Sequence, residues 1–145
     1  VNTAARLESG AKQYGVFTMC SEKTLEQAGP QEFVSRLIDK VKVMGKSEPV
    51  ITYELLSTDR KGTPELRLLV EKFNEARELF VAMKWDEAEA KYRECLDLEP
   101  NHPDRELGCI TTPSHVFIER CAMYREQPPV EEGETWDGIF TATSK

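Results

Sequence analysis

Hydrophobic residues change their spacing partway along the 145-residue chain. In the first part they occur in short runs and alternations that are typical of strands. The apolar run "VFTMC" over residues 16–20 predicts a buried strand, and alternation from Asp39 onward and over residues 49–56 predicts two more. Short helices are expected over residues 2–13 and 21–29, the second opening with a serine cap. The first part is therefore expected to mix strands with helices.

Beyond this part the apolar positions recur every three or four residues, which is the helical period. One apolar stripe consists of Leu66, Leu69, Val70, Phe73, Ala76, Phe80 and Met83. A second stripe, after a turn, consists of Ala88, Tyr92, Cys95 and Leu96. Residues 113–127 predict a third helix, whereas the tail has too little periodicity for another. The tail carries one apolar cluster of Trp136, Ile139 and Phe140. Together the two parts predict an α+β fold.

Charge and turn residues place a boundary near the segment "STDRKGTP". Residues 1–62 carry nine basic and eight acidic side chains, whereas residues 63–145 carry ten basic and eighteen acidic ones. Surfaces that bind nucleic acid or anionic membranes need basic patches, so we expect no nucleic-acid partner. The predicted units are residues 1–57, a linker over 58–65, helices over 66–126 and a tail over 127–145.

The cysteines and the hydropathy indicate a protein of the cytoplasm. Cys20, Cys95, Cys109 and Cys121 are too widely spaced for a C-x₂-C metal knuckle. Without a secretory signal, they are expected to be reduced rather than paired in disulfides. No apolar run approaches the ~20 residues that cross a bilayer, so this piece is expected to be soluble. The missing starter methionine is also compatible with an upstream anchor, which would make the chain the cytoplasmic part of a membrane-anchored sensor.

The chain opens with an asparagine and an arginine one helical turn apart. Asn2 and Arg6 would stand on the same helix face, where both can address one ligand. The guanidinium of an arginine suits phosphate oxygens, and an amide can bond a sugar or ring oxygen. The pair therefore suits a nucleotide that undergoes phosphoryl chemistry. Taken by itself, the pattern is more typical of a solvated helix face.

The order of several short motifs supports the nucleotide hypothesis. The opening "VNTAARLE", a strand, and "MGKSEPVITYELL" about forty residues on resemble the end of the catalytic domain of class III adenylate/guanylate cyclases. The resemblance covers roughly residues 1–56 and implies that Asn2 orients the ribose and that Arg6 stabilises the phosphate transition state. The family's triphosphate-binding lysine is replaced by Met44, so Lys42 or Lys46 would have to substitute. Both lysines are equally compatible with a solvated edge strand.

The resemblance also implies a reaction and its partners. Class III cyclases convert ATP or GTP into the cyclic nucleotide and pyrophosphate, with Mg²⁺ or Mn²⁺ held by two aspartates. Those aspartates belong to the half of the domain that would precede Val1, so this chain alone is expected to be inactive and to supply no metal ligand. Family sites form between two domains, which implies a homodimer. Which of the two nucleotides is used stays open at this stage.

The helical part carries a second resemblance. "FNEARELFVAMKWDEAEAKYRECLDLEP" is similar to a single tetratricopeptide repeat, with Ala76 and Ala88 where two helices approach closely, Trp85 at the turn and Tyr92 as the large packing residue. One repeat cannot bury both of its faces, so it should pack on the third helix, on the cyclase part or on another chain. The ending resembles the tail that follows the cyclase domain in bacterial sensor cyclases.

Two alternatives remain open on the sequence. The first is that the chain is a catalytically silent cyclase remnant that acts as a protein-interaction module through its helices; Met44 favours it, whereas intact Asn2 and Arg6 favour the enzyme. The second concerns Trp136, which either closes a hydrophobic gap in the tail or anchors a partner or second protomer.

Overall fold

The computed structural model describes residues 14–16, 18–42, 48–100 and 111–141. In chain order its elements are β1 (Met19–Ser21), α2 (Glu22–Ala28), the short 3₁₀ helix η1 (Pro30–Glu32), β2 (Val34–Lys42), β3 (Val50–Ser57), α3 (Pro64–Val81), α4 (Trp85–Leu96), α5 (Pro113–Glu126) and β4 (Ile139–Thr141). The predicted α+β class is confirmed.

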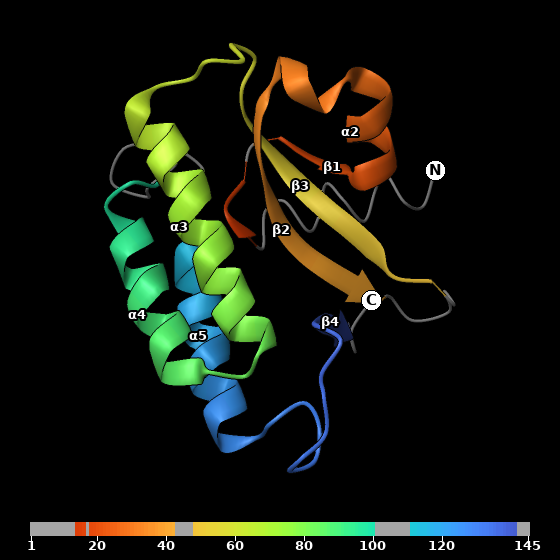
Figure 1. Ribbon diagram of the computed structural model, residues 1–145, viewed down its shortest axis with the longest axis vertical. Coiled ribbons are helices and arrows are strands. Elements are labelled where there is room, and N and C mark those ends of the chain that lie inside the picture. Colours follow the sequence, from red (N-terminus) through yellow and green to blue (C-terminus); the bar gives the residue numbers. More distant parts are fainter. Residues whose placement is uncertain (1–13, 17, 43–47, 101–110, 142–145) are drawn as a thin grey trace.

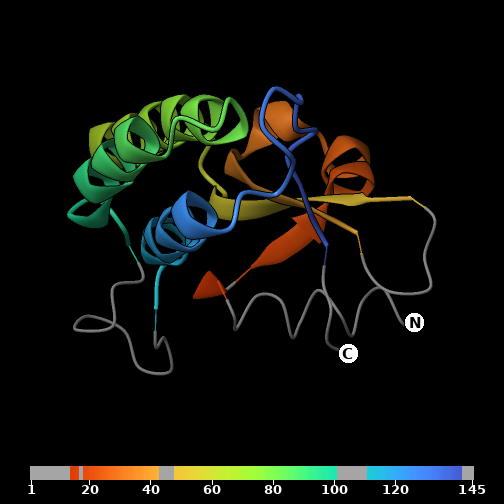
Figure 2. The same ribbon diagram turned by 90° about the horizontal axis from the view of Figure 1, so that it is seen from below.

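The strands form one sheet in the order β1-β3-β2-β4. β3 pairs antiparallel with both β1 and β2, whereas β4 pairs in parallel with the end of β2. In Figure 1 the helices α3, α4 and α5 lie together on one side of the sheet, and α2 lies on the other side of the molecule. The view in Figure 2 shows the same separation. The last strand therefore brings the C-terminal part of the chain back to the first part.

Side-chain oxygens begin three of the helices. Ser21 accepts a hydrogen bond from the backbone N–H of Thr24, as the predicted serine cap of α2 requires. Thr63 and Thr112 cap α3 and α5 in the same way, and each is followed by a proline at the first helical position. The third helix matches the segment predicted from the apolar spacing.

Two strands differ from the sequence-based expectation. β1 begins at Met19, later than the apolar run over residues 16–20 suggested. β4 was not expected, because three residues of strand carry no periodicity of their own and depend on pairing with β2. On β3, the residues most deeply buried are Thr52 and Glu54, whereas the more apolar alternate face is only half-buried.

A register shift in β2 explains how two neighbouring residues are both buried. The pairing with β3 is irregular between Leu37 and Asp39. At such a bulge, consecutive side chains can turn toward the same face of the sheet. Ile38 and Asp39 are accordingly both buried, at 0% and 1% exposure.

One hydrophobic core joins the sheet to the helices. Its centre is aromatic, with Phe80 contacting the rings of Phe117, Tyr124 and Trp136 edge-on or tilted. Tyr14, Val16 and Ile38 from the first part of the chain belong to the same cluster as the residues of α3, α4 and α5. The helical hairpin thus gains the cover that it was expected to need, from both α5 and the sheet. Trp136 is buried at 6% exposure and packs in this core, in agreement with the alternative that it closes a hydrophobic gap.

Candidate functional site

Lys42 is the one residue of the predicted nucleotide site that falls within the described ranges. Asn2, Arg6 and Lys46 lie outside them, as does Met44. Lys42 is the exposed last residue of β2, opposite Thr141 in the parallel pairing with β4. Lys42 forms no ion pair with another residue of the described ranges.

A buried carboxylate lies three residues before Lys42 on the same strand. Asp39 accepts from the Nη1 of Arg120 at 2.5 Å and from the Nη1 of Arg77 at 3.3 Å. The hydroxyl of Tyr14 also donates to Asp39, and so does the backbone N–H of Lys40 at 2.8 Å. Two guanidiniums and a phenol from three separate segments therefore converge on one carboxylate, which meets the requirement that buried charges be paired.

Arg120 makes the widest set of contacts in this cluster. Its Nη2 donates to the Tyr14 hydroxyl at 2.8 Å, and its guanidinium carbon lies 3.7 Å from the ring centre of Phe140. The same group lies 5.0 Å from the ring centre of Phe117. Planar guanidinium groups stack on aromatic faces in this way. Burial and the neighbouring Asp39 raise the pKa of Tyr14, so the phenol stays protonated and serves as a donor.

The segment around Tyr14 is also held by backbone packing. Gly15 has a φ of +73°, and a Cβ at this position would lie 1.9 Å from the carbonyl oxygen of Thr111. No side chain fits between these two backbones, so only glycine allows the contact. The junction after the predicted opening helix is thereby fixed against the residues that precede α5.

A second buried ionic cluster joins the sheet to the segment that follows α4. The Nε of Arg36 donates to Glu54 at 2.7 Å, and its two Nη atoms donate to Glu99 at 3.0 and 2.6 Å. The guanidinium also lies 4.6 Å from the ring centre of Phe73. Glu99 accepts two further hydrogen bonds, from the backbone N–H and the hydroxyl of Ser114 at the start of α5.

The described residues of this cluster include two carboxylates and one guanidinium, all of them buried. Burial raises the pKa of Glu54 to about 7, with Glu99 adding to the effect and Arg36 opposing it. The pKa of Arg36 is raised by Glu99 and Glu54 against the opposing effect of burial. The raised pKa of Glu54 brings its titration close to neutral pH.

The sequence analysis missed both clusters. Arg36 and Asp39 interrupt a strand that is otherwise rich in apolar residues, and Arg120 lies on the third helix beside residues assigned to its inward face. Charged residues at inward positions are almost never fully buried unless they are paired, and this was the available signal. Their partners are 63 and 81 residues away in the chain, which sequence spacing does not reveal.

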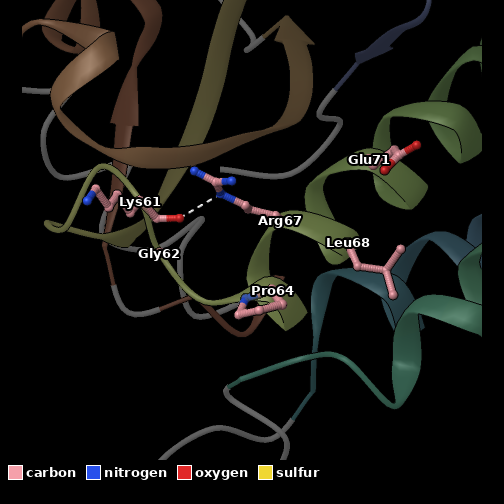
Figure 3. Close-up of a pocket in the computed structure, with 6 residues that line it drawn as sticks. All are labelled: Lys61, Gly62, Pro64, Arg67, Leu68 and Glu71. Atoms are coloured by element: carbon pink, nitrogen blue, oxygen red, sulfur yellow. Dashed lines mark hydrogen bonds between the residues drawn. The ribbon is translucent and has the colours of Figure 1, made fainter.

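Other features of the described structure offer no competing site. An open depression beside the start of α3 is lined by Lys61, Gly62, Pro64, Arg67, Leu68 and Glu71 (Figure 3). There Arg67 is already engaged with the carbonyl of Lys61 at 2.6 Å, and the depression gathers no convergent polar groups. Cys20, Cys95 and Cys121 are buried free thiols. The described residues contain no cluster of histidine, cysteine and carboxylate side chains suited to a metal ion, and no helix among them is long and apolar enough to cross a membrane.

Comparison with known proteins relates the chain to adenylate cyclases. It is 30% identical over 124 residues to the terminal-differentiation-specific adenylate cyclase of Dictyostelium discoideum, a match that covers 83% of this chain and 5% of that protein. It is 44% identical over 57 residues to an adenylate cyclase of Anabaena cylindrica, covering 38% of this chain and 11% of that protein. The chain thus spans a small part of the length of these relatives. No protein-family model matches it, and no solved structure does.

The extent of the first match bears on the organisation of the chain. A match over 83% of 145 residues leaves about 25 residues of the chain outside it. Wherever the match begins, it therefore includes the central elements β2, β3, α3 and α4. The similarity to the Dictyostelium protein therefore extends through the helical hairpin and is not confined to the strands. The chain is related in sequence to adenylate cyclases along most of its length.

Proposed function

We propose that the chain is the C-terminal part of a class III nucleotide cyclase, with residues 1–57 completing the catalytic domain and residues 66–126 forming a helical extension packed on it. The observation that carries this proposal is the match to the Dictyostelium adenylate cyclase across both parts of the chain. The single core shared by the sheet and helices supports it, because the two parts fold as one unit. The names of both relatives favour ATP as the substrate and cyclic AMP as the product.

In this proposal each predicted site residue has a distinct task. The amide of Asn2 orients the ribose so that its 3′-hydroxyl can attack the α-phosphate. The guanidinium of Arg6 stabilises the charge that develops as pyrophosphate leaves. Lys42, exposed at the end of β2, binds the triphosphate in place of the missing lysine at Met44, with Lys46 as the second candidate.

The remaining parts of the site would come from outside this chain. Bound Mg²⁺ or Mn²⁺ would supply charge neutralisation at the phosphates. The described residues offer no ligand cluster for it, so the carboxylates are proposed to belong to a preceding segment of a longer protein. We propose that this longer protein acts in cytoplasmic signalling, forms its site as a homodimer and offers its helical extension to a further protein partner. The 145-residue chain alone should then be inactive.

A chimeric enzyme tests this function without knowledge of the longer protein. Residues 1–57 of this chain replace their counterpart in the Anabaena adenylate cyclase, and cyclic AMP formation from ATP is measured with Mn²⁺. The expected result is an active chimera, whereas the 145-residue chain alone gives no product above a blank. An inactive but folded chimera would contradict the proposal that these residues form a competent half-site.

Two substitutions in the active chimera test the phosphate contact at β2. Lys42→Ala should raise KM for ATP by the equivalent of about 1.5–3 kcal/mol, the range for a hydrogen bond to a charged group. Met44→Lys should lower KM by restoring the expected donor. The matched control is Lys40→Ala, which removes a lysine from the same strand two residues earlier. Equal KM values in all variants would show that this strand makes no phosphate contact.

The second candidate function is a silent remnant that acts through its helices, and Met44 is the observation that favours it. This candidate predicts that neither the chimera nor its Met44→Lys variant forms cyclic AMP. It also predicts that the helical part binds a protein partner when Arg6 is replaced by alanine, because the opening residues would then serve no chemistry.

A further inference from the structure

One arginine of the helical extension contacts three segments that lie far from it in the sequence. Arg120, on α5, donates to Tyr14 at 2.8 Å and to Asp39 at 2.5 Å, and its guanidinium lies over the ring of Phe140 at 3.7 Å. Tyr14 comes from the first part of the chain, Asp39 from β2 and Phe140 from β4. Few side chains can bridge three elements with hydrogen bonds and stacking, and the planar guanidinium is suited to both.

Two of these segments adjoin residues of the proposed site along the chain, and the third pairs with one of them. Tyr14 is the last helical residue before Gly15, and the opening motif with Asn2 and Arg6 precedes it in the chain. Asp39 lies three residues before Lys42 on the same strand, and Phe140 pairs with Val41 between them. Arg120 therefore contacts segments that adjoin, along the chain, the residues proposed for catalysis and phosphate binding.

We propose that Arg120 is a positioning residue, which couples the helical extension to the nucleotide site by holding Tyr14, Asp39 and Phe140 in one arrangement. Its catalytic consequence rests on the proposed function, whereas the coupling between α5 and the Tyr14 segment does not. The helical extension is then part of the machinery that orders the site. Movement of α5, for example on binding a protein partner, would change the rate of cyclisation.

The surroundings of Arg120 show why its loss should loosen this arrangement without unfolding the chain. Asp39 keeps a second cation, because Arg77 lies 3.3 Å from its other carboxylate oxygen. Arg77 also donates to the carbonyl of Gly138 at 3.2 Å, which continues to hold the start of β4. The Tyr14 hydroxyl, in contrast, loses a donor that only Arg120 supplies among the described residues. The effect should therefore concentrate at Tyr14.

A second arginine on the same helix provides the matched control. Arg125 is also paired with two carboxylates, Asp86 at 2.9 Å and Glu89 at 2.9 Å, and both lie on α4. Its replacement removes one charge and two ion pairs within the helical part. Replacement of Arg120 also removes one charge, but with it the ion pair to Asp39 and the hydrogen bond to Tyr14. Effects that Arg120→Met shows and Arg125→Met lacks therefore report the coupling and not a general loss of helix stability.

Hydrogen exchange of the 145-residue chain tests the coupling directly. In Arg120→Met the peptide that contains Tyr14 and the peptides that contain β2 and β4 should exchange about 10-fold faster, within the 5–150-fold range of typical site-to-site coupling. Peptides of α4 should be unchanged. Arg120→Lys keeps a cation for Asp39 but lacks the planar guanidinium that also reaches Tyr14. In this variant, faster hydrogen exchange should be confined to the Tyr14 peptide. Unchanged exchange at Tyr14 in both variants, or the same pattern in Arg125→Met, would overturn the coupling.

Kinetics of the longer cyclase test the positioning role. Arg120→Met should lower kcat about 10- to 100-fold, the scale expected when catalytic groups are displaced by around 1 Å, and should change KM less than twofold. Arg125→Met should match the wild type. Faster exchange at Tyr14 together with a normal kcat would overturn the positioning role. A wild-type protein without cyclase activity would refute the proposed function and the catalytic role with it, and the exchange data would still decide the coupling.

Discussion

Replacement of Glu54 by glutamine should remove a pH dependence of stability that the buried Arg36 cluster creates. Glu54 is 1% exposed and shares one guanidinium with Glu99. Burial disfavours the charged form of Glu54, Glu99 adds to this effect and Arg36 opposes it, so the pKa of Glu54 is raised from an ordinary 4.5 to about 7. Glutamine has nearly the same shape and still offers Arg36 an acceptor, but it cannot titrate.

The sign and size of the effect follow from this shift. Because the folded state binds the proton more tightly than the unfolded state, the contribution of Glu54 to stability is fully present below pH 4.5 and is lost as the pH rises through 7. A shift from 4.5 to about 7 corresponds to roughly 3 kcal/mol at 1.36 kcal/mol per pH unit. We therefore expect the difference in free energy of unfolding, wild type minus Glu54→Gln, to fall by roughly 3 kcal/mol between pH 4.5 and 7. Above pH 7 the difference should level off.

Urea unfolding followed by circular dichroism at several pH values between 5 and 8 measures this difference. Glu94→Gln is the control, because Glu94 is an exposed carboxylate on α4 whose pKa is lowered by Lys72. Its difference from the wild type should be flat over the same range, since a lowered pKa affects stability only at more acidic pH. A flat or rising difference for Glu54→Gln would refute the reasoning, since it would mean that Arg36 keeps Glu54 ionised in the folded state.

Three further predictions concern stability, each read from urea unfolding at constant pH. Gly15→Ala should lower the free energy of unfolding by more than about 2 kcal/mol, because the new Cβ would clash with the Thr111 backbone and strain a residue with positive φ. Gly133→Ala is the control, since φ is also positive there but a Cβ meets nothing within 4 Å, and it should lower the free energy of unfolding by only about 1 kcal/mol. Equal losses in the two variants would show that the Thr111 contact is absent. Tyr92→Phe should leave the free energy of unfolding unchanged or raise it by about 1 kcal/mol, because the Tyr92 hydroxyl is buried without a hydrogen-bond partner in the described structure. A clear destabilisation would indicate that a bridging water satisfies this hydroxyl. Trp136→Ala should cost about 3–5 kcal/mol as a buried aromatic of the shared core, and a cost below about 1 kcal/mol would contradict its place beside Phe80.

The sequence was informative wherever structure depends on local spacing. The stripe from Leu69 through Phe80 predicts α3 because residues three and four apart share a helix face, and the Ser21 cap marks the start of α2 for an equally local reason. The prediction that the helical hairpin needs external cover also holds, since it follows from how little surface one helix pair can bury.

Features that depend on distant partners were beyond the sequence. β4 exists because residues 139–141 pair with β2, about 100 residues earlier in the chain. The burial of Asp39 requires a bulge beside it and arginines from α3 and α5. Charged residues of this kind are read as exposed unless their partners are known, so the contacts around Arg120 emerge only from the folded chain.

The central claim is that the opening motif completes a cyclase active site, and the most direct test is the kinetics of Arg6→Ala in the longer cyclase. Loss of one donor that stabilises developing charge typically lowers kcat about 10²–10³-fold. KM for ATP should change little, because the charge that Arg6 meets develops mainly in the transition state. Lys12→Ala, from the same predicted helix, serves as the control. A kcat that is unchanged in Arg6→Ala would contradict the account and leave the opening segment as a solvated helix face.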